Sequence, residues 1–152
     1  MNIVDKISGS WADWTFEDFN INYEKVSIKI SFEPIGYYNA DGTVNKNYTG
    51  EDQHVTIHCN NFIGFSFVGH WDESAVESIK IEQTGDLITS SLQEIKRLNG
   101  DPPVPLLGGG LKNIDGQWYQ LNLKLDDGNI IKVACESFEV ESNNYDLQVY
   151  FS

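Results

Sequence analysis

Basic residues are scarce in this chain: ten lysines and arginines stand against 23 aspartates and glutamates, so the formal net charge is −13. Both halves carry the excess, with 11 acidic and four basic residues in 1–76 and 12 and six in 77–152. Such a field repels nucleic acid and anionic membranes and speeds the approach of a basic partner. We therefore expect a basic protein partner, no nucleic acid and no membrane; the other interpretation is solubility alone.

Long apolar runs are missing as well. No stretch approaches the roughly 18 apolar residues that a membrane span requires. The first residues, "MNIVDKISGSWADWTFEDF", lack the apolar core of a signal peptide and carry acidic residues that transit peptides avoid. From these two absences we expect a cytoplasmic protein, in which the two cysteines are reduced. Its length is typical of a single domain over 1–152.

The two cysteines stand in two copies of one pattern, "HVTIHCNNF" at 54–62 and "IKVACESF" at 131–138. In each copy two aliphatic residues alternate with spacers, a cysteine follows, and a phenylalanine comes three positions later. Alternation with a period of two is typical of a strand with one buried face. Each cysteine thus ends an apolar row, and we predict that Cys59 and Cys135 are small, buried hydrophobic residues.

Another alternating stretch precedes each copy, "KVSIKISF" at 25–32 and "QLNLKLDDGNI" at 120–130. Asp127-Gly128 in the second favours a hairpin, because a tight turn needs positive φ. A long polar connection, 33–53, joins the first pair instead. The repeat predicts a mainly β fold built on a duplicated β-hairpin. Whether the hairpins form one antiparallel sheet or a sandwich stays open at this point.

One α-helix is expected near 86–98, with Asp86 as its cap and Asn99-Gly100 followed by "DPPVP" as its end. "ESIKIEQ" at 77–83 is interpreted as the strand before it, and the apolar run 62–68 as a central strand. The apolar stripe predicted to pack the helix on the sheet is Leu87, Ile88, Leu92, Ile95 and Leu98.

Catalytic and metal-binding patterns are weak. Four residues of strand separate His54 from His58 by about 13 Å, too far to share one zinc ion at about 2 Å per ligand. Cys59 follows His58 directly, and neighbouring strand residues point to opposite faces, so they do not form a thiolate–base pair. We expect that the protein is not an enzyme and that it binds no cofactor and no metal ion. One combination stays open for His58, with His70, Asp72 or Glu73 in "GHWDES".

The stretches "FIGFSFVGHWDES" at 62–74 and "KLDDGNIIKVACESFEVE" at 124–141 resemble small immunity proteins of bacterial polymorphic-toxin systems. The resemblance implies a stand-alone, non-catalytic bacterial protein that binds and neutralises a partner toxin. The acidic charge agrees with that implication, because nuclease toxins tend to be basic and an acidic inhibitor can occupy a nucleic-acid cleft.

If the partner is a basic toxin domain, the contact surface is expected on acidic loops carried by a rigid β-core. An aromatic residue ringed by polar groups is typical of an interface hot spot. The predicted partner-binding residues are Asp41, Glu51 and Asp52 in the 33–53 connection, and Trp71, Asp72 and Glu73 in "GHWDES". The alternative is a carbohydrate- or ligand-binding β-module, since four tryptophans and seven tyrosines can supply a stacking platform.

Overall fold

The computed structural model describes residues 14–33, 43, 54–69, 75–100, 114–126 and 128–143. These residues form six strands and one helix, which confirms a mainly β fold with a helix close to 86–98. The elements are β1 Thr15–Asn22, β2 Ser27–Glu33, β3 His54–Val68, β4 Val76–Glu82, α2 Asp86–Asn99, β5 Tyr119–Leu125 and β6 Ile130–Asn143.

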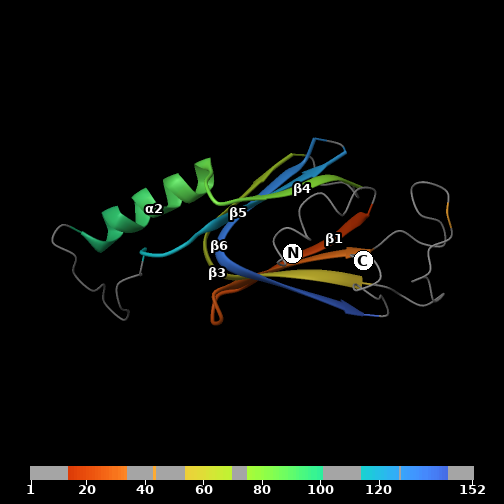
Figure 1. Cartoon of the computed structure of the whole chain (residues 1–152), viewed down its shortest axis with the longest axis horizontal. Coiled ribbons are helices and arrows are strands. Elements are labelled where there is room, and N and C mark those ends of the chain that lie inside the picture. Colours follow the sequence, from red (N-terminus) through yellow and green to blue (C-terminus); the bar gives the residue numbers. More distant parts are fainter. Residues whose placement is uncertain are drawn as a thin grey trace.

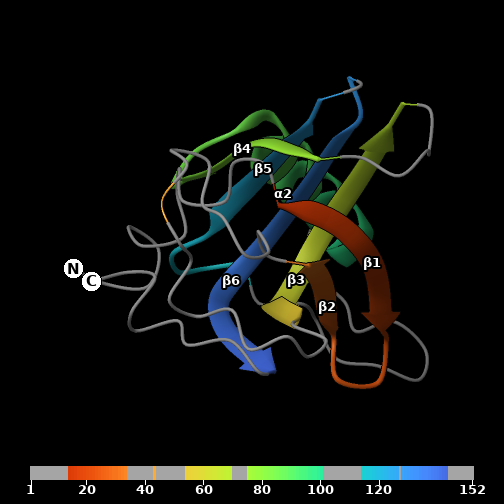
Figure 2. The ribbon, with the colours of Figure 1, turned by 90° about the vertical axis from the view of Figure 1, so that its right-hand side faces the viewer.

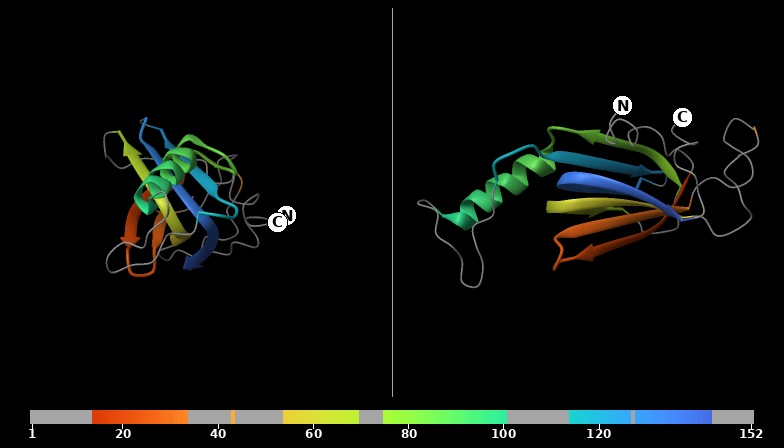
Figure 3. Two further views of the ribbon diagram at one scale, coloured as in Figure 1. Left: turned by 90° about the vertical axis from the view of Figure 1, so that its left-hand side faces the viewer. Right: turned by 60° about the horizontal axis from the view of Figure 1, so that its bottom comes forward.

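The six strands belong to one antiparallel sheet with the order β1-β2-β3-β6-β5-β4. Each half is a run of three neighbouring strands, β1 to β3 and β4 to β6, and the helix lies between β4 and β5 in the chain. Figure 3 (right) shows this order across the sheet, from green β4 to orange β1. The repeated unit is therefore larger than the predicted hairpin, because each copy has three strands.

The two copies of the repeated pattern pair with each other at the centre of the sheet. Cys59 lies opposite Phe138, and Phe62 lies opposite Cys135. A twofold rotation between β3 and β6 would exchange these two pairs, so the local register follows the sequence repeat. The chain thus uses its repeat to place the two long strands beside each other, and the apolar run 62–68 is central, as predicted.

The backbone of β3 is irregular just after its cysteine. On β3, Asn61 adopts φ 53, in the left-handed region that asparagine tolerates better than most residues. Its side-chain amide donates a hydrogen bond to Glu136 of β6, within the matching part of that strand. Figure 1 shows β3 and β6 bending together. This bend explains why a spacing of three keeps cysteine and phenylalanine in the same core.

The bend folds the sheet over on itself. The rings of Phe19 on β1 and Phe67 near the end of β3 have centroids only 4.3 Å apart. The outer strands also meet, because Thr15 bridges Ala75 just before β4 and the Val76 N–H donates to the Trp14 carbonyl at 2.7 Å. Figure 2 shows the curled sheet from one end. The answer to the open question is one sheet whose two halves face each other.

The core lies between these two halves and takes residues from both copies of the repeat. Val55, Ile57 and Cys59 on β3 and the matching row on β6 are fully buried, as predicted. Both cysteines are free thiols. Other fully buried large side chains include Trp14, Ile28, Ile30, Phe32, Ile79, Leu121, Leu123 and Leu125.

The helix packs on the outer side of the sheet with its first half only. Leu87, Ile88 and Leu92 contact a second apolar cluster made by Ile63, Trp118 and Ala134. Gly64 permits this approach, because a Cβ there would lie 2.2 Å from the Ser91 hydroxyl oxygen. Farther along, α2 runs away from the sheet (Figure 1). Only part of the predicted five-residue stripe therefore packs on the sheet, since Ile95 is half-buried and Leu98 is 48% exposed.

The predicted cap at Asp86 is wrong, because the N-cap position is occupied by Gly85, which has no side chain to cap the helix. Instead Gln120 of β5 accepts hydrogen bonds from the backbone N–H groups of Leu87 and Ile88, at 2.9 and 3.2 Å. These are two of the N–H groups that a helix start leaves without an internal partner. Gly85 makes room, because a Cβ there would lie 2.1 Å from the Gln120 side chain.

Candidate functional site

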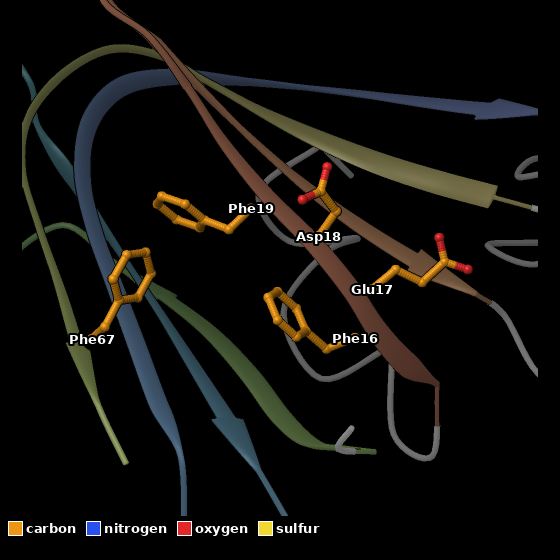
Figure 4. A pocket seen from close by; sticks show the side chains of 5 residues that line it. All are labelled: Phe16, Glu17, Asp18, Phe19 and Phe67. Atoms are coloured by element: carbon orange, nitrogen blue, oxygen red, sulfur yellow. The ribbon is translucent and has the colours of Figure 1, made fainter. Parts of the chain in front are cut away.

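A hollow of about 400 Å³ opens between β1 and the end of β3. Its lining residues are Phe16, Glu17, Asp18, Phe19 and Phe67. Figure 4 shows the three phenylalanine rings on one side of β1 and the two carboxylates pointing away on the other side. The hollow is thus bordered by both apolar and acidic side chains of β1.

The apolar wall of the hollow is a continuation of the core. Phe19 packs edge-on against Phe67, and both approach Phe65, with centroid distances of 6.0 and 5.7 Å. Phe16 packs edge-on against the buried ring of Phe32 at 6.4 Å. Phe67 is 39% exposed and the next residue, Val68, is 61% exposed. The hollow therefore has a rigid base and an apolar rim that water reaches.

The acidic side arises from a β-bulge in β1. Phe16 pairs with Phe32 and Asp18 with Ser31, so the register shifts and Glu17 is the extra residue. A bulge places two successive side chains on one face, and here these are Glu17 and Asp18. Both are exposed. The same shift lets Phe16 and Phe19, three positions apart, share the opposite, apolar face.

Glu17 is held in place from the neighbouring part of the sheet. Its carboxylate lies 2.8 Å from Nδ1 of His54, the first residue of β3. His58 has a different partner, because its Nε2 lies 2.9 Å from the Glu141 carboxylate on β6. The two histidines thus contact separate glutamates. In the described ranges, no three His, Cys, Asp or Glu side chains group as metal ligands.

The buried Cys135 thiol is a poor nucleophile. Burial raises the pKa of the Cys135 thiol well above its ordinary value, and the neighbouring Cys59 raises it further. A thiol must lose its proton to attack a substrate, so this environment suits a core residue rather than a reactive one. The sulfur of Cys135 lies 3.6 Å from the Ser137 carbonyl, which accepts its weak hydrogen bond.

A second polar cluster surrounds the start of α2. The Gln120 side-chain nitrogen donates to Asp86 and to Asn122, each at 2.9 Å, and Lys132 donates to Asp86 at 2.9 Å. The hydrogen bond from Gln120 and the Lys132 ammonium lower the pKa of Asp86 to about 2. Because its groups bond to one another, this cluster positions the helix, and we assign it no ligand.

The partner-binding residues predicted from the sequence, in 33–53 and 70–74, lie outside the described residues. They are Asp41, Glu51, Asp52, Trp71, Asp72 and Glu73. His70, left open above as a metal ligand together with His58, lies outside as well. Their role stays a prediction, and the structure brings forward a different acidic surface.

The sequence did give a signal for this surface, but an irregular one. "TFEDFNIN" at 15–22 lacks strict alternation, because the bulge separates Phe16 from Phe19 by three positions. A strand search that allows one extra residue at Glu17 would align Phe16, Phe19 and Ile21 on one face. The contact between Phe19 and Phe67 has no signal in the sequence, since it depends on the bend in β3.

No protein-family model matches this chain, and no curated protein matches it either. Among solved structures, it is similar to an uncharacterized protein from Neisseria gonorrhoeae, with a TM-score of 0.35 and 10% identity. The match covers 86% of this chain and 92% of that one. Within the described ranges, no helix has the length and apolar character needed to cross a membrane.

Proposed function

We propose that this chain is a non-catalytic acidic binding protein of the bacterial cytoplasm, and that it acts as an immunity protein that neutralises a basic toxin. The observation that carries the proposal is the surface on β1, where two carboxylates adjoin a hollow lined by three phenylalanines. Interfaces gain most of their affinity from a few apolar anchors and use surrounding charge for selection and encounter rate.

Rigidity supports this use of the surface. The rings of Phe16 and Phe19 pack on core residues, and Glu17 is bonded to His54. A surface that is already ordered loses little conformational entropy when a partner binds. The formal charge of −13 adds long-range attraction for a basic protein.

A ligand-binding β-module is the second candidate, and the size of the hollow favours it. About 400 Å³ lies within the usual range of small-molecule pockets, about 300–1,000 Å³. Its rings are all phenylalanines, and its carboxylates point away from them. A ligand would therefore have to be mainly apolar, which disfavours a sugar and leaves the protein partner as the better candidate.

Co-expression tests the proposal. The open reading frame next to this gene is expressed in a bacterial host, alone and together with this chain. We expect the neighbour to be toxic and wild-type chain to restore growth. A non-toxic neighbour, or a toxic one that the wild-type chain fails to neutralise, would contradict the immunity function.

Charge-reversal variants locate the surface. Asp18→Lys should reduce rescue, whereas Glu139→Lys on β6 is the matched control, since Glu139 is also an exposed acidic residue on a strand. The pair Asp72→Lys and Glu73→Lys tests the loop predicted from the sequence. If only the loop variant loses rescue, the toxin is bound by the loop and not by β1.

A further inference from the structure

Within the described residues, one edge of strand β1 has little pairing with other strands. On one side it pairs with β2 along its length, from Thr15–Glu33 to Asn22–Ser27. On its other side, pairing within the described residues is limited to the bridge between Thr15 and Ala75. Beyond the bulge, Asp18–Asn22 continues in regular register. An edge of this kind is a template for an added strand.

Side chains alternate along Asp18–Asn22 in a pattern that a bound strand would meet. Phe19 and Ile21 lie on the half-buried, apolar side together with the hollow, whereas Asp18 and Asn20 are exposed on the other. A strand added to an edge projects its own side chains alternately to the same two faces. The residues of the added strand must therefore alternate between apolar side chains on one face and polar side chains on the other.

The charge of this surface indicates whether the added strand comes from a second copy of the chain or from a different protein. A second copy added through its own β1 would bring Glu17 and Asp18 close to the same carboxylates. Like charges on neighbouring strands are destabilising. A basic segment would instead neutralise them. The observations thus favour a segment whose exposed side carries Lys or Arg and whose other side is apolar.

We propose that an extended segment of a basic protein binds by adding a strand to the Asp18–Asn22 edge of β1. One apolar side chain of that segment enters the hollow lined by Phe16, Phe19 and Phe67, and flanking Lys or Arg side chains face Glu17 and Asp18. Main-chain hydrogen bonds supply affinity in this mode, and alternate side-chain sites supply selectivity. The inference rests on the proposed function in taking the partner to be a basic protein.

A synthetic peptide tests this directly. The probe is an acetylated and amidated octapeptide that alternates Lys with Val or Phe, titrated into the full chain and followed by calorimetry and by amide NMR signals of β1. We expect binding, with the largest shifts in Asp18–Asn22. A peptide with Glu in place of Lys should bind at least about tenfold more weakly, since it places like charges opposite Asp18.

N-methylation separates strand addition from side-chain docking. Methylating the backbone nitrogens of the Lys residues removes the N–H donors on one edge of the peptide. Methylating the backbone nitrogens of the apolar residues removes the N–H donors on the other edge. Only one edge faces β1, so one methylated peptide should keep its affinity and the other should lose about tenfold or more. Equal binding of both, or no binding of the parent peptide, would overturn the proposal.

Protein variants add the matched control. Asp18→Lys should reduce the affinity for the parent peptide by about tenfold or more, while Glu139→Lys should keep that affinity within about twofold of the wild-type value. An unchanged affinity in Asp18→Lys would also count against the proposal. The peptide result is independent of toxin rescue. Edge-selective binding without rescue would retain the β1 site and reject the immunity function, whereas rescue without peptide binding would do the reverse.

Discussion

Gln120 is the residue that joins the helix to the sheet. It is only 2% exposed, and its oxygen accepts from the first N–H groups of α2 while its nitrogen donates to Asp86 and Asn122. Gln120→Ala would leave two helix N–H groups without this acceptor. We expect a loss of about 1–3 kcal/mol in the free energy of unfolding, measured by urea denaturation.

Asn122→Ala is the comparison for this prediction. Asn122 is half-buried and does not cap the helix, so its removal should cost less than that of Gln120. If the urea midpoint of Gln120→Ala equals that of wild type, the helix start does not depend on this cap.

The Asp86 carboxyl gives the protein an acid-sensitive contact. Hydrogen bonding to Gln120 and Lys132 lowers its pKa from 3.8 to about 2. Because the folded-state pKa is depressed, the stabilisation is fully present above pH about 4 and is lost as the pH falls toward 2. Asp86 is 72% exposed, so the contribution should be below about 1 kcal/mol.

The measurement for Asp86 is the difference in free energy of unfolding between wild type and Asp86→Asn across that pH range. The difference should shrink as the pH falls from 4 to 2, because the Asp86 carboxyl takes up a proton and loses the charge that distinguishes it from Asn. A difference that stays constant over this range would show that the carboxylate charge contributes nothing.

Cys59 and Cys135 should behave as two core thiols. Both are fully buried, and burial raises the pKa of Cys135. We expect slow reaction with a thiol reagent in the native protein and fast reaction of two thiols per chain in denaturant. A mass lower by two hydrogens under non-reducing conditions would show a disulfide and contradict the prediction.

At the scale of elements, the helix divides into a packed half and a projecting half. Ile88 is 7% exposed in the cluster with Trp118 and Ala134, whereas Leu98 is 48% exposed. Ile88→Ala should therefore cost about 2–4 kcal/mol, as other core truncations do. Leu98→Ala should change stability by no more than about 0.5 kcal/mol. Leu92→Ala, in a half-buried position, should fall between them.

Denaturant midpoints at constant m-value check this order. Equal losses for Ile88→Ala and Leu98→Ala would mean that both halves of α2 are packed. The sequence stripe alone predicts such equality, because helical spacing shows which residues share a face but not how far the neighbouring sheet extends.

The same distinction explains which strands were predictable. β2, β3, β4, β5 and β6 have regular alternation or strong apolar runs, and their local pattern was enough. β1 was missed because its bulge breaks the alternation. The candidate hollow was missed for a related reason. It depends on contacts between residues far apart in the chain, Phe19 and Phe67, which arise only when β3 bends at Asn61.

At the scale of the whole molecule, the repeat and the surface have one origin. The matched register at Cys59–Phe138 and Phe62–Cys135 joins the two three-stranded halves at the centre. The bend beside it brings the apolar faces together and carries the end of β3 over β1. The surface proposed to bind a partner lies within the first half, between β1 and the end of β3, and it therefore depends on this bend.

This arrangement predicts that the two halves unfold together. Neither has a core of its own, because one buried cluster takes Ile28 and Ile57 from the first half and Leu123 and Ile131 from the second. Separating them would also expose the long central edge of β3, which pairs with β6 over most of its length. Far-UV circular dichroism, thiol exposure and the amide signals of β1 should therefore show one urea midpoint. Amide signals of β1 that disappear at lower urea than the β5–β6 signals would show that the first half unfolds independently, and the binding surface would then be less stable than the fold.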